Sequence, residues 1–318
     1  MAGELPDNAQ TTVDLDAGLQ TQIDESTIIA ESQYMVWAAA IDRDDPLETG
    51  TGIVYPLLGA LDPVSTELDA DVNPASIDLS DDVATITVGE YGNPAHLAAR
   101  INRASKTRAV QGVIDGLTQN MAESVDLIQG NAAVAGTVIR IADRAANVAA
   151  LTTANIMDRA EVIAARATLR AAKAPMFPDG LYRAILSPYS ISDILASGSV
   201  GDFTDVAKYV DQSAILTGEI GTWLGFRFFE ASQANLTNNG AGAAADGNTV
   251  GDLVKAVFCG QRYLRSVTQE RPAVRVKPLG DSMDRFLSVF WKGLFGVGRI
   301  RNANGVVWKG RSAYAPHA

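Results

Sequence analysis

The sequence has very few of the side chains that bind metals or act as nucleophiles. Its 318 residues include one cysteine, Cys259, and two histidines, His96 and His317. One cysteine excludes an intrachain disulfide bond, and this inventory also excludes a structural zinc site built from Cys and His. A Ser/His/Asp or Cys/His relay would depend on His96, which follows Asn93-Pro94 at an expected helix start, where a capping role explains it better.

Other signatures of chemistry are missing too. The sequence has no GxSxG elbow, no Walker-type phosphate loop and no HExxH helix. The glycine pattern from Gly240 to Ala245 lies in polar low-complexity sequence, so it does not indicate a dinucleotide site. Two groups of aspartates have oxygen ligands for calcium, but neither has EF-hand spacing; they are Asp42, Asp44, Asp45 and Asp78, Asp81, Asp82. We predict no catalytic residue, no cofactor and no metal site.

Apolar residues are plentiful but dispersed. They make up 47% of the chain, and the mean hydropathy is +0.05, so a sizeable core can form. No apolar run approaches the roughly 20 residues of a membrane helix, and the N-terminus lacks the basic and apolar segments of a signal peptide. We expect neither secretion nor insertion into a membrane.

Basic residues are nearly absent from the first hundred positions. That stretch holds 19 acids against Arg43 and Arg100, a balance of −17, whereas the remainder holds 18 acids against 24 bases, a balance of +6. Because the two parts of the chain carry opposite charge, the acidic part could lie on a basic surface of its own chain or of a neighbour. A solvated acidic face explains the excess of acids equally well. The overall negative charge argues against a dedicated nucleic-acid binder.

The first ninety residues predict an arm followed by a hairpin. The arm carries one short helix over Ile28–Ala40, and turn signals at Asp44-Asp45-Pro46 and Gly50-Thr51-Gly52 follow before any strand begins. The runs IVYPLL and ATITV then predict two long strands with a loose tip between them. A lone hairpin is marginal in water, so this one needs an outside surface to lie against.

The clearest periodicity predicts a long amphipathic helix from about Leu97 to Ile128. Beginning after Tyr91-Gly92-Asn93-Pro94, it would extend for roughly 48 Å at 1.5 Å per residue and act as a structural spine. Its apolar face consists of Val110, Val113, Ile114, Leu117, Met121, Val125 and Ile128.

Beyond this helix the pattern predicts a mixed α and β region. A helix begins near Thr152 or Thr153, and its expected inner face is Ile156, Ala160, Ile163 and Ala167. LYRAIL predicts a strand, and Ser190 to Asp193 resembles a capping box that opens the next helix.

The last third predicts mainly strands. A glycine-rich turn at Gly218–Gly221 leads into the strand Phe226–Glu230, and 235–249 is an exposed, flexible loop. AVFCG and FLSVFWKGLFGV are late strands on either side of an Arg-rich connection around Arg262, Arg265 and Arg271.

Three motifs in this order carry a resemblance. They are Tyr91-Gly92 before the spine helix, LYRAILSP up to Pro188 followed by Asp193, and GEIGTWLGFRFFEAS from Gly218 to Ser232. Together they resemble the major capsid proteins of tailed bacteriophages, more narrowly those of podovirus-type phages, and the resemblance covers nearly the whole chain.

The resemblance implies an α+β fold, the tailed-phage major capsid fold. An N-terminal arm would span 1–50, an extended two-stranded loop 51–92, a peripheral domain with the spine helix 93–150 and 262–318, and an axial domain 151–261. It also implies self-assembly into hexamers and pentamers of an icosahedral shell that encloses double-stranded DNA. The hairpin would then lie across the adjacent subunit.

The expected partners follow from the same resemblance. They are other copies of the chain, scaffolding, portal and cement proteins, and packaged DNA through non-specific contact, with assembly in the host bacterial cytoplasm and a final place in the virion. The first lysine is Lys106, so a lysine crosslink from residues 51–92 is excluded. The expected contact residues, which also fit ordinary core or turn positions, are Tyr55, Leu57, Leu58, Gly218, Glu219, Ile220 and Gly221.

Three alternatives stay open on the sequence. An encapsulin-like compartment would share the fold and enclose cargo protein instead of a genome. A cytoplasmic hydrolase lacks a credible nucleophile and base pair. A monomeric binding module would show one dominant pocket.

Overall fold

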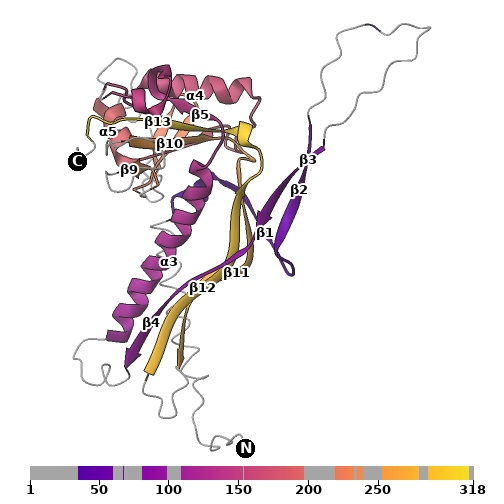
Figure 1. Cartoon of the computed structure of the whole chain (residues 1–318), viewed down its shortest axis with the longest axis vertical. Coiled ribbons are helices and arrows are strands. Elements are labelled where there is room, and N and C mark those ends of the chain that lie inside the picture. The colour runs from indigo at the N-terminus through magenta and orange to yellow at the C-terminus, as the bar shows by residue number, and fades with distance from the viewer. Residues whose placement is uncertain are drawn as a thin grey trace, which may run out of the picture.

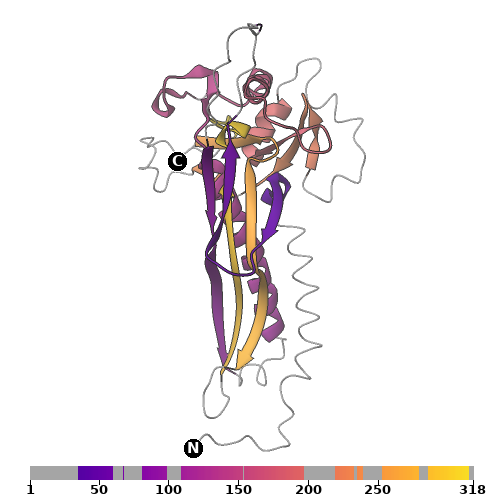
Figure 2. The ribbon, with the colours of Figure 1, turned by 90° about the vertical axis from the view of Figure 1, so that its right-hand side faces the viewer.

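The computed structural model describes residues 35–59, 67, 81–98, 109–152, 154–196, 219–232, 235–238, 253–278 and 286–314. Within these ranges the chain forms two larger sheets, helices packed on them and a separate two-stranded hairpin (Figure 1). Long strands and one long helix run down from an upper part that mixes short strands and helices (Figure 2). The predicted mixture of α and β structure is confirmed.

The lower sheet has four strands in the order β1-β11-β12-β4. These strands are β1 (Ile41–Pro46), β11 (Leu264–Pro278), β12 (Phe286–Arg299) and β4 (Gly89–Ala98). β1 pairs with β11 in parallel, and the other two pairings are antiparallel. The helix α3 (Ala109–Val134) runs along one face of the sheet, as Figure 2 shows, and buries Ile114 and Met121 against Val274, Val289 and Trp291.

The upper sheet has seven strands in the described residues, in the order β5-β13-β10-β6-β8-β7, with β9 also paired to β10. They are β5 (Ile139–Ile141), β6 (Tyr182–Leu186), β7 (Glu219–Trp223), β8 (Phe226–Glu230), β9 (Thr237–Asn238), β10 (Leu253–Cys259) and β13 (Gly305–Gly310).

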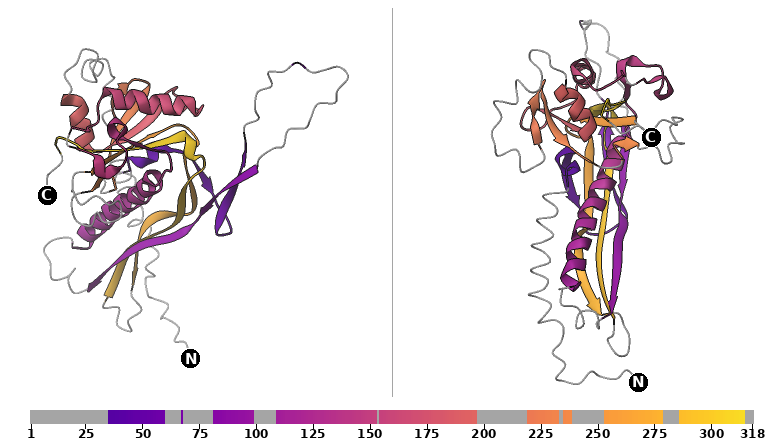
Figure 3. Two further views of the ribbon diagram at one scale, coloured as in Figure 1. Left: turned by 45° about the horizontal axis from the view of Figure 1, so that its top comes forward. Right: turned by 90° about the vertical axis from the view of Figure 1, so that its left-hand side faces the viewer.

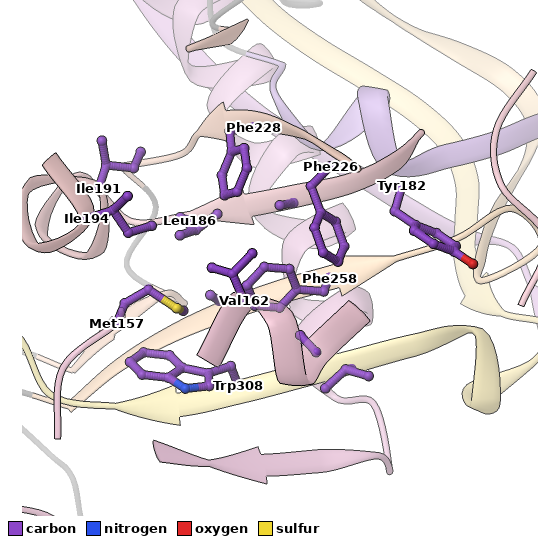
Figure 4. Packing of buried hydrophobic residues seen from close by; sticks show 14 of the residues in the cluster. Met157, Val162, Tyr182, Leu186, Ile191, Ile194, Phe226, Phe228, Phe258 and Trp308 are labelled. Carbon is purple, nitrogen blue, oxygen red and sulfur yellow. The ribbon is translucent and has the colours of Figure 1, made fainter. Parts of the chain in front are cut away.

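Two helices, α4 (Arg159–Ala171) and α5 (Pro188–Ala196), pack on the upper sheet. Between them and the strands lies the largest core cluster, which includes Val162, Phe226, Phe258 and Trp308 (Figure 4). The short 3-10 helices are η1 (Trp37–Ala40), η2 (Ala142–Arg144), η3 (Val148–Ala150) and η7 (Asn302–Asn304).

The third sheet is the predicted hairpin of β2 (Gly52–Leu58) and β3 (Asp81–Thr87), whose antiparallel pairing runs from Gly52–Thr87 to Leu58–Asp81. It leaves the side of the molecule near the junction of the two larger sheets (Figure 3). The predicted strands at LYRAIL, Phe226–Glu230, AVFCG and FLSVFWKGLFGV are also confirmed as β6, β8, β10 and β12.

The ends of the spine helix were predicted incorrectly. Leu97 belongs to β4, and the described helix starts at Ala109 and continues past Ile128 to Val134. The residues Tyr91-Gly92-Asn93-Pro94, after which the helix was expected to begin, lie inside β4 because β12 supplies hydrogen-bonding partners from Gly89 to Ala98. Tertiary pairing therefore overrides the local turn signal.

Two further segments that the sequence predicted to be connections are strands of the lower sheet. Asp44-Asp45-Pro46 is the end of β1, so a strand begins at Ile41, before the predicted break. The Arg-rich connection contains the start of β11, a strand of 15 residues. Of the expected helix Ile28–Ala40, only residues from Met35 are described, and η1 covers its last four. The other part lies outside the described residues.

The inner face predicted for α4 was wrong. The helix buries Glu161, Val162, Ala165 and Leu169, while Ile163 is 46% exposed. Glu161 faces inward because Arg140 Nε and Trp308 Nε1 donate to its Oε2 at 2.8 and 3.0 Å. A buried carboxylate in this position turns the apolar stripe of the sequence pattern toward solvent.

Several local predictions in the upper part also need correction. Ser187, rather than Ser190, caps α5, because its Oγ accepts a hydrogen bond from the Ser190 amide at 3.2 Å. The predicted turn Gly218–Gly221 is largely strand β7 from Glu219, and the chain reverses at Leu224-Gly225. Of the loop 235–249, Leu236 is buried and the next two residues form β9. Residues 239–249 lie outside the described ranges.

Candidate intersubunit surfaces

The hairpin root packs on the lower sheet of its own chain. Ile86 of β3 is buried with Val267 and Ile300, and Ile53, Tyr55 and Leu57 pack around them, partly buried. Ile53, Tyr55 and Leu57 occupy alternate positions of β2, so their side chains lie on one face of the hairpin, which we call the inner face. The inner face is therefore covered within the subunit.

Two glycines of β12 let β3 cross the sheet at close range. A Cβ at Gly296 would collide with the carbonyl oxygen of Thr87, and one at Gly298 would lie 2.7 Å from Cγ1 of Ile86. Both positions lie where β12 meets the hairpin root. The absence of side chains there sets how closely the hairpin approaches the sheet.

A polar cluster fixes the root from the other side. The Tyr55 hydroxyl donates to Asp45 Oδ2 at 2.6 Å, and the Arg265 guanidinium lies 4.9 Å from the centre of the Tyr55 ring. Asp45 also pairs with Arg43 at 2.7 Å and with Arg265 at 3.5 Å. Burial, and then the hydrogen bond to Asp45, raises the pKa of Tyr55 to about 12.

The outer face of the hairpin is apolar and open. Val54 and Val83 are 58% and 59% exposed, and Pro56 is paired with Val83 across the two strands. Val54 and Val83, on the two strands of one hairpin, therefore leave apolar side chains open to solvent on its outer face. Of the predicted contacts, Tyr55 and Leu57 lie on the inner face, and the prediction omitted Val54 and Val83, although alternation along β2 separates Val54 from Tyr55 and Leu57.

The predicted contact residues divide between two different sheets. Tyr55 and Leu57 face the subunit's own sheet, and Leu58 pairs with Asp81 at the outer end of β2. Glu219, Ile220 and Gly221 are in β7, the edge strand of the upper sheet, where Gly221 has a φ of +151° at a bulge. Gly218 lies outside the described residues. A role of any of these residues between subunits stays a prediction.

The residues considered for chemistry do not gather. His96 is exposed on β4, and His317 lies outside the described ranges. Cys259 is fully buried, and burial raises the pKa of its thiol to about 12, so it stays protonated at neutral pH. In the described part of the chain, no group of three or more His, Cys, Asp or Glu residues is arranged to hold a metal ion. None of the helices described is both long and apolar enough to cross a membrane.

Known structures share this architecture. The capsid of Ralstonia phage GP4 superposes with a TM-score of 0.68 at 14% identity, covering 90% of this chain and 92% of that one. The chain has the major capsid fold of tailed phages. The capsid of cyanophage Pam1 matches with a TM-score of 0.62 at 15% identity, over 84% of this chain and 86% of the other.

A third structure, from Mycobacterium phage Che8, matches with a TM-score of 0.58 at 16% identity, and the match covers 86% of this chain and 90% of the phage chain. No protein-family model and no curated protein matches the sequence. The likeness is thus one of the whole fold at low identity, and it extends over nearly the full length of the chains compared.

Proposed function

We propose that the chain is the major shell subunit of a tailed phage, which assembles into hexamers and pentamers of an icosahedral capsid around double-stranded DNA. The observation that carries this proposal is the shared fold, which spans 84–90% of the chain in the three phage structures above. Because the similarity extends over most of the chain, it supports a shell role for the chain as a whole.

The hairpin supports the same role on physical grounds. Its inner face is covered by its own subunit, whereas Val54 and Val83 on the outer face are open. A two-stranded hairpin gains stability when a further surface covers it. We assign that surface to an adjacent subunit. In the proposed division of the chain, 1–50 is the arm, 51–92 the extended loop, 93–150 and 262–318 the peripheral domain, and 151–261 the axial domain.

The proposed partners are other copies of this chain, scaffolding, portal and cement proteins, and DNA held without sequence recognition. Assembly takes place in the host cytoplasm, and the final location is the virion. The phage capsids favour this proposal over the encapsulin-like alternative. In a shell of this kind the chain acts through contacts and not as an enzyme.

Expression of the chain, alone and with its neighbouring genes, tests the proposal. The products are separated by sedimentation, and the largest fraction is imaged by electron microscopy. Closed shells, or rings of five and six subunits, are the expected result. A monomer under every condition contradicts the proposal, and shells filled with cargo protein and free of DNA would support the encapsulin-like alternative.

A further inference from the structure

The helix α4 has an uncovered apolar row on its outer side. Val162, on the inner side, lies toward Phe258 and Trp308 in the core (Figure 4). On the outer side Ile163 is 46% exposed, and Ala160, Ala167 and Ala171 are exposed. Steps of three and four residues place these four side chains on one side of the helix. In the described structure this row faces solvent.

Four bases run beside that row. Arg159, Arg166 and Arg170 follow one another at steps of seven and four residues, so they also share one side of the helix, and Lys173 comes directly after the helix C-cap Ala172. Arg159, Arg170 and Lys173 are exposed, and Arg166 is half-buried beside Gly225. Among the residues that the structure describes, no carboxylate forms an ion pair with any of the four.

The acids near these bases are already engaged. Glu161 is buried on the inner side and pairs with Arg140, and the Asp158 carboxylate accepts the Glu161 amide as the helix cap. The outer side of α4 therefore combines four bases with an apolar row and has no acid. We call these eight residues the α4 surface.

We propose that the α4 surface binds the acidic outer end of the hairpin of a second copy of this chain. The inference rests on the proposed function and deepens it, because it names a receptor for the hairpin. The charge of the chain itself supports the choice of partner. Residues 59–82 hold seven acids and no lysine, arginine or histidine, together with apolar residues at intervals. A basic and apolar surface is complementary to such a segment.

The direction of the hairpin favours a second copy over the same chain. In Figure 1 and the left panel of Figure 3, β2 and β3 project from the side of the molecule, and their outer ends are separate from α4. Leu58 and Asp81, the last pair of the hairpin, stand at its outer end, and Asp82 beside them is exposed. The exposed apolar row argues for a protein partner, since a nucleic acid would be held by the bases alone.

A charge-swap experiment on the full chain tests this contact. Arg159→Glu with Arg170→Glu reverses two bases of the α4 surface, and Asp81→Lys with Asp82→Lys reverses two acids of the hairpin. Each pair alone is expected to lower the yield of shells about tenfold, and all four changes together to restore most of it, because opposite charges face each other again. The yield is measured by sedimentation at low salt, where surface charges are least screened.

The control is Arg262→Glu with Lys277→Glu, which makes the same change of charge at two exposed bases elsewhere and should leave the yield within about twofold of wild type. Thermal unfolding of each subunit checks that the substitutions leave the fold intact. Equal yields from the α4 variant and wild type, or a failure of the four-fold variant to recover, overturn the inference. Normal shells with less nucleic acid in the α4 variant overturn it in favour of DNA as the partner. Absence of shells from wild type contradicts instead the proposed function.

Discussion

The hydroxyl of Tyr55 lies 2.6 Å from Oδ2 of Asp45, and this hydrogen bond joins the hairpin to the edge strand of the lower sheet. Arg265 of β11 lies over the Tyr55 ring and contacts the same carboxylate, so three strands meet at this cluster. The hairpin root is thus fixed before any neighbour arrives. Its direction from the body is a property of the subunit.

Tyr55→Phe should lower the free energy of unfolding by about 1 kcal/mol, because it removes this hydrogen bond and keeps the ring. Tyr314→Phe is the matched control, since Tyr314 is 55% exposed near the end of the described chain. Urea unfolding of the purified subunit measures both. Equal effects of the two substitutions would contradict a fixing role for Tyr55.

Tyr55 also predicts a loss of stability at alkaline pH. Its pKa is raised from 10.0 to about 12, first by burial and then by the hydrogen bond to Asp45, so the folded state favours the protonated form. Its contribution is therefore complete below pH 10 and is lost as the pH rises toward about 12. An ultraviolet titration of wild type minus Tyr55→Phe isolates this group. A difference curve centred near pH 10 would show that the hydroxyl is not held as described.

The sequence was informative where one pattern decides the structure. The strands of the hairpin, β6, β8, β10 and β12, and the central part of α3 follow from apolar alternation or periodicity. β4 could not be predicted because its Tyr91-Gly92-Asn93-Pro94 segment has turn chemistry, and only the partner strand β12 makes it a strand. The inward face of α4 depends on Glu161, whose burial requires Arg140 and Trp308 from other elements.

The candidate contact residues show the same limit. Alternation along β2 separates Tyr55 and Leu57 from Val54, but it does not say which side the subunit itself covers. That depends on Gly296 and Gly298 of β12, more than two hundred residues away in sequence, which admit β3 at close range. The side of the hairpin that is free for a partner is therefore a property of the tertiary structure.

Gly296→Ala should displace the hairpin root. The new methyl group would meet the backbone carbonyl of Thr87, which cannot move aside as a flexible side chain can, so we expect a loss of about 2 kcal/mol in unfolding free energy and fewer shells. Gly116→Ala is the control, because nothing lies within 4 Å of a Cβ there and α3 should gain up to about 1 kcal/mol. Thermal unfolding and sedimentation of both variants measure the difference. Gly296→Ala shells of normal yield and stability would show that the close crossing is dispensable.

Glu161→Gln should be strongly destabilising. The Glu161 side chain is 4% exposed and accepts hydrogen bonds from Arg140 and Trp308, so the neutral amide leaves the partly buried Arg140 without its counter-charge. Breaking such a pair from one side costs on the order of 3 kcal/mol. Glu230→Gln at the exposed end of β8 is the control and should change stability by less than about 0.5 kcal/mol. Denaturant unfolding that does not separate the two variants would contradict the structural role of Glu161.

Val54→Ser with Val83→Ser tests whether the outer face of the hairpin is a contact surface. Both side chains are more than half exposed in the subunit, so their replacement should change its unfolding free energy by less than about 0.5 kcal/mol each. If a neighbour buries the two valines, the serines remove buried apolar area from every copy of the contact, at a cost of about 25 cal/mol per Å². The shell yield then falls. Ile139→Ser is the control, because Ile139 on β5 is 52% exposed and lies outside both proposed contact surfaces. Sedimentation measures assembly, and unfolding of the free subunit measures its stability. Reduced assembly with unchanged subunit stability identifies a contact. Unchanged assembly means that the hairpin meets its neighbour by another face.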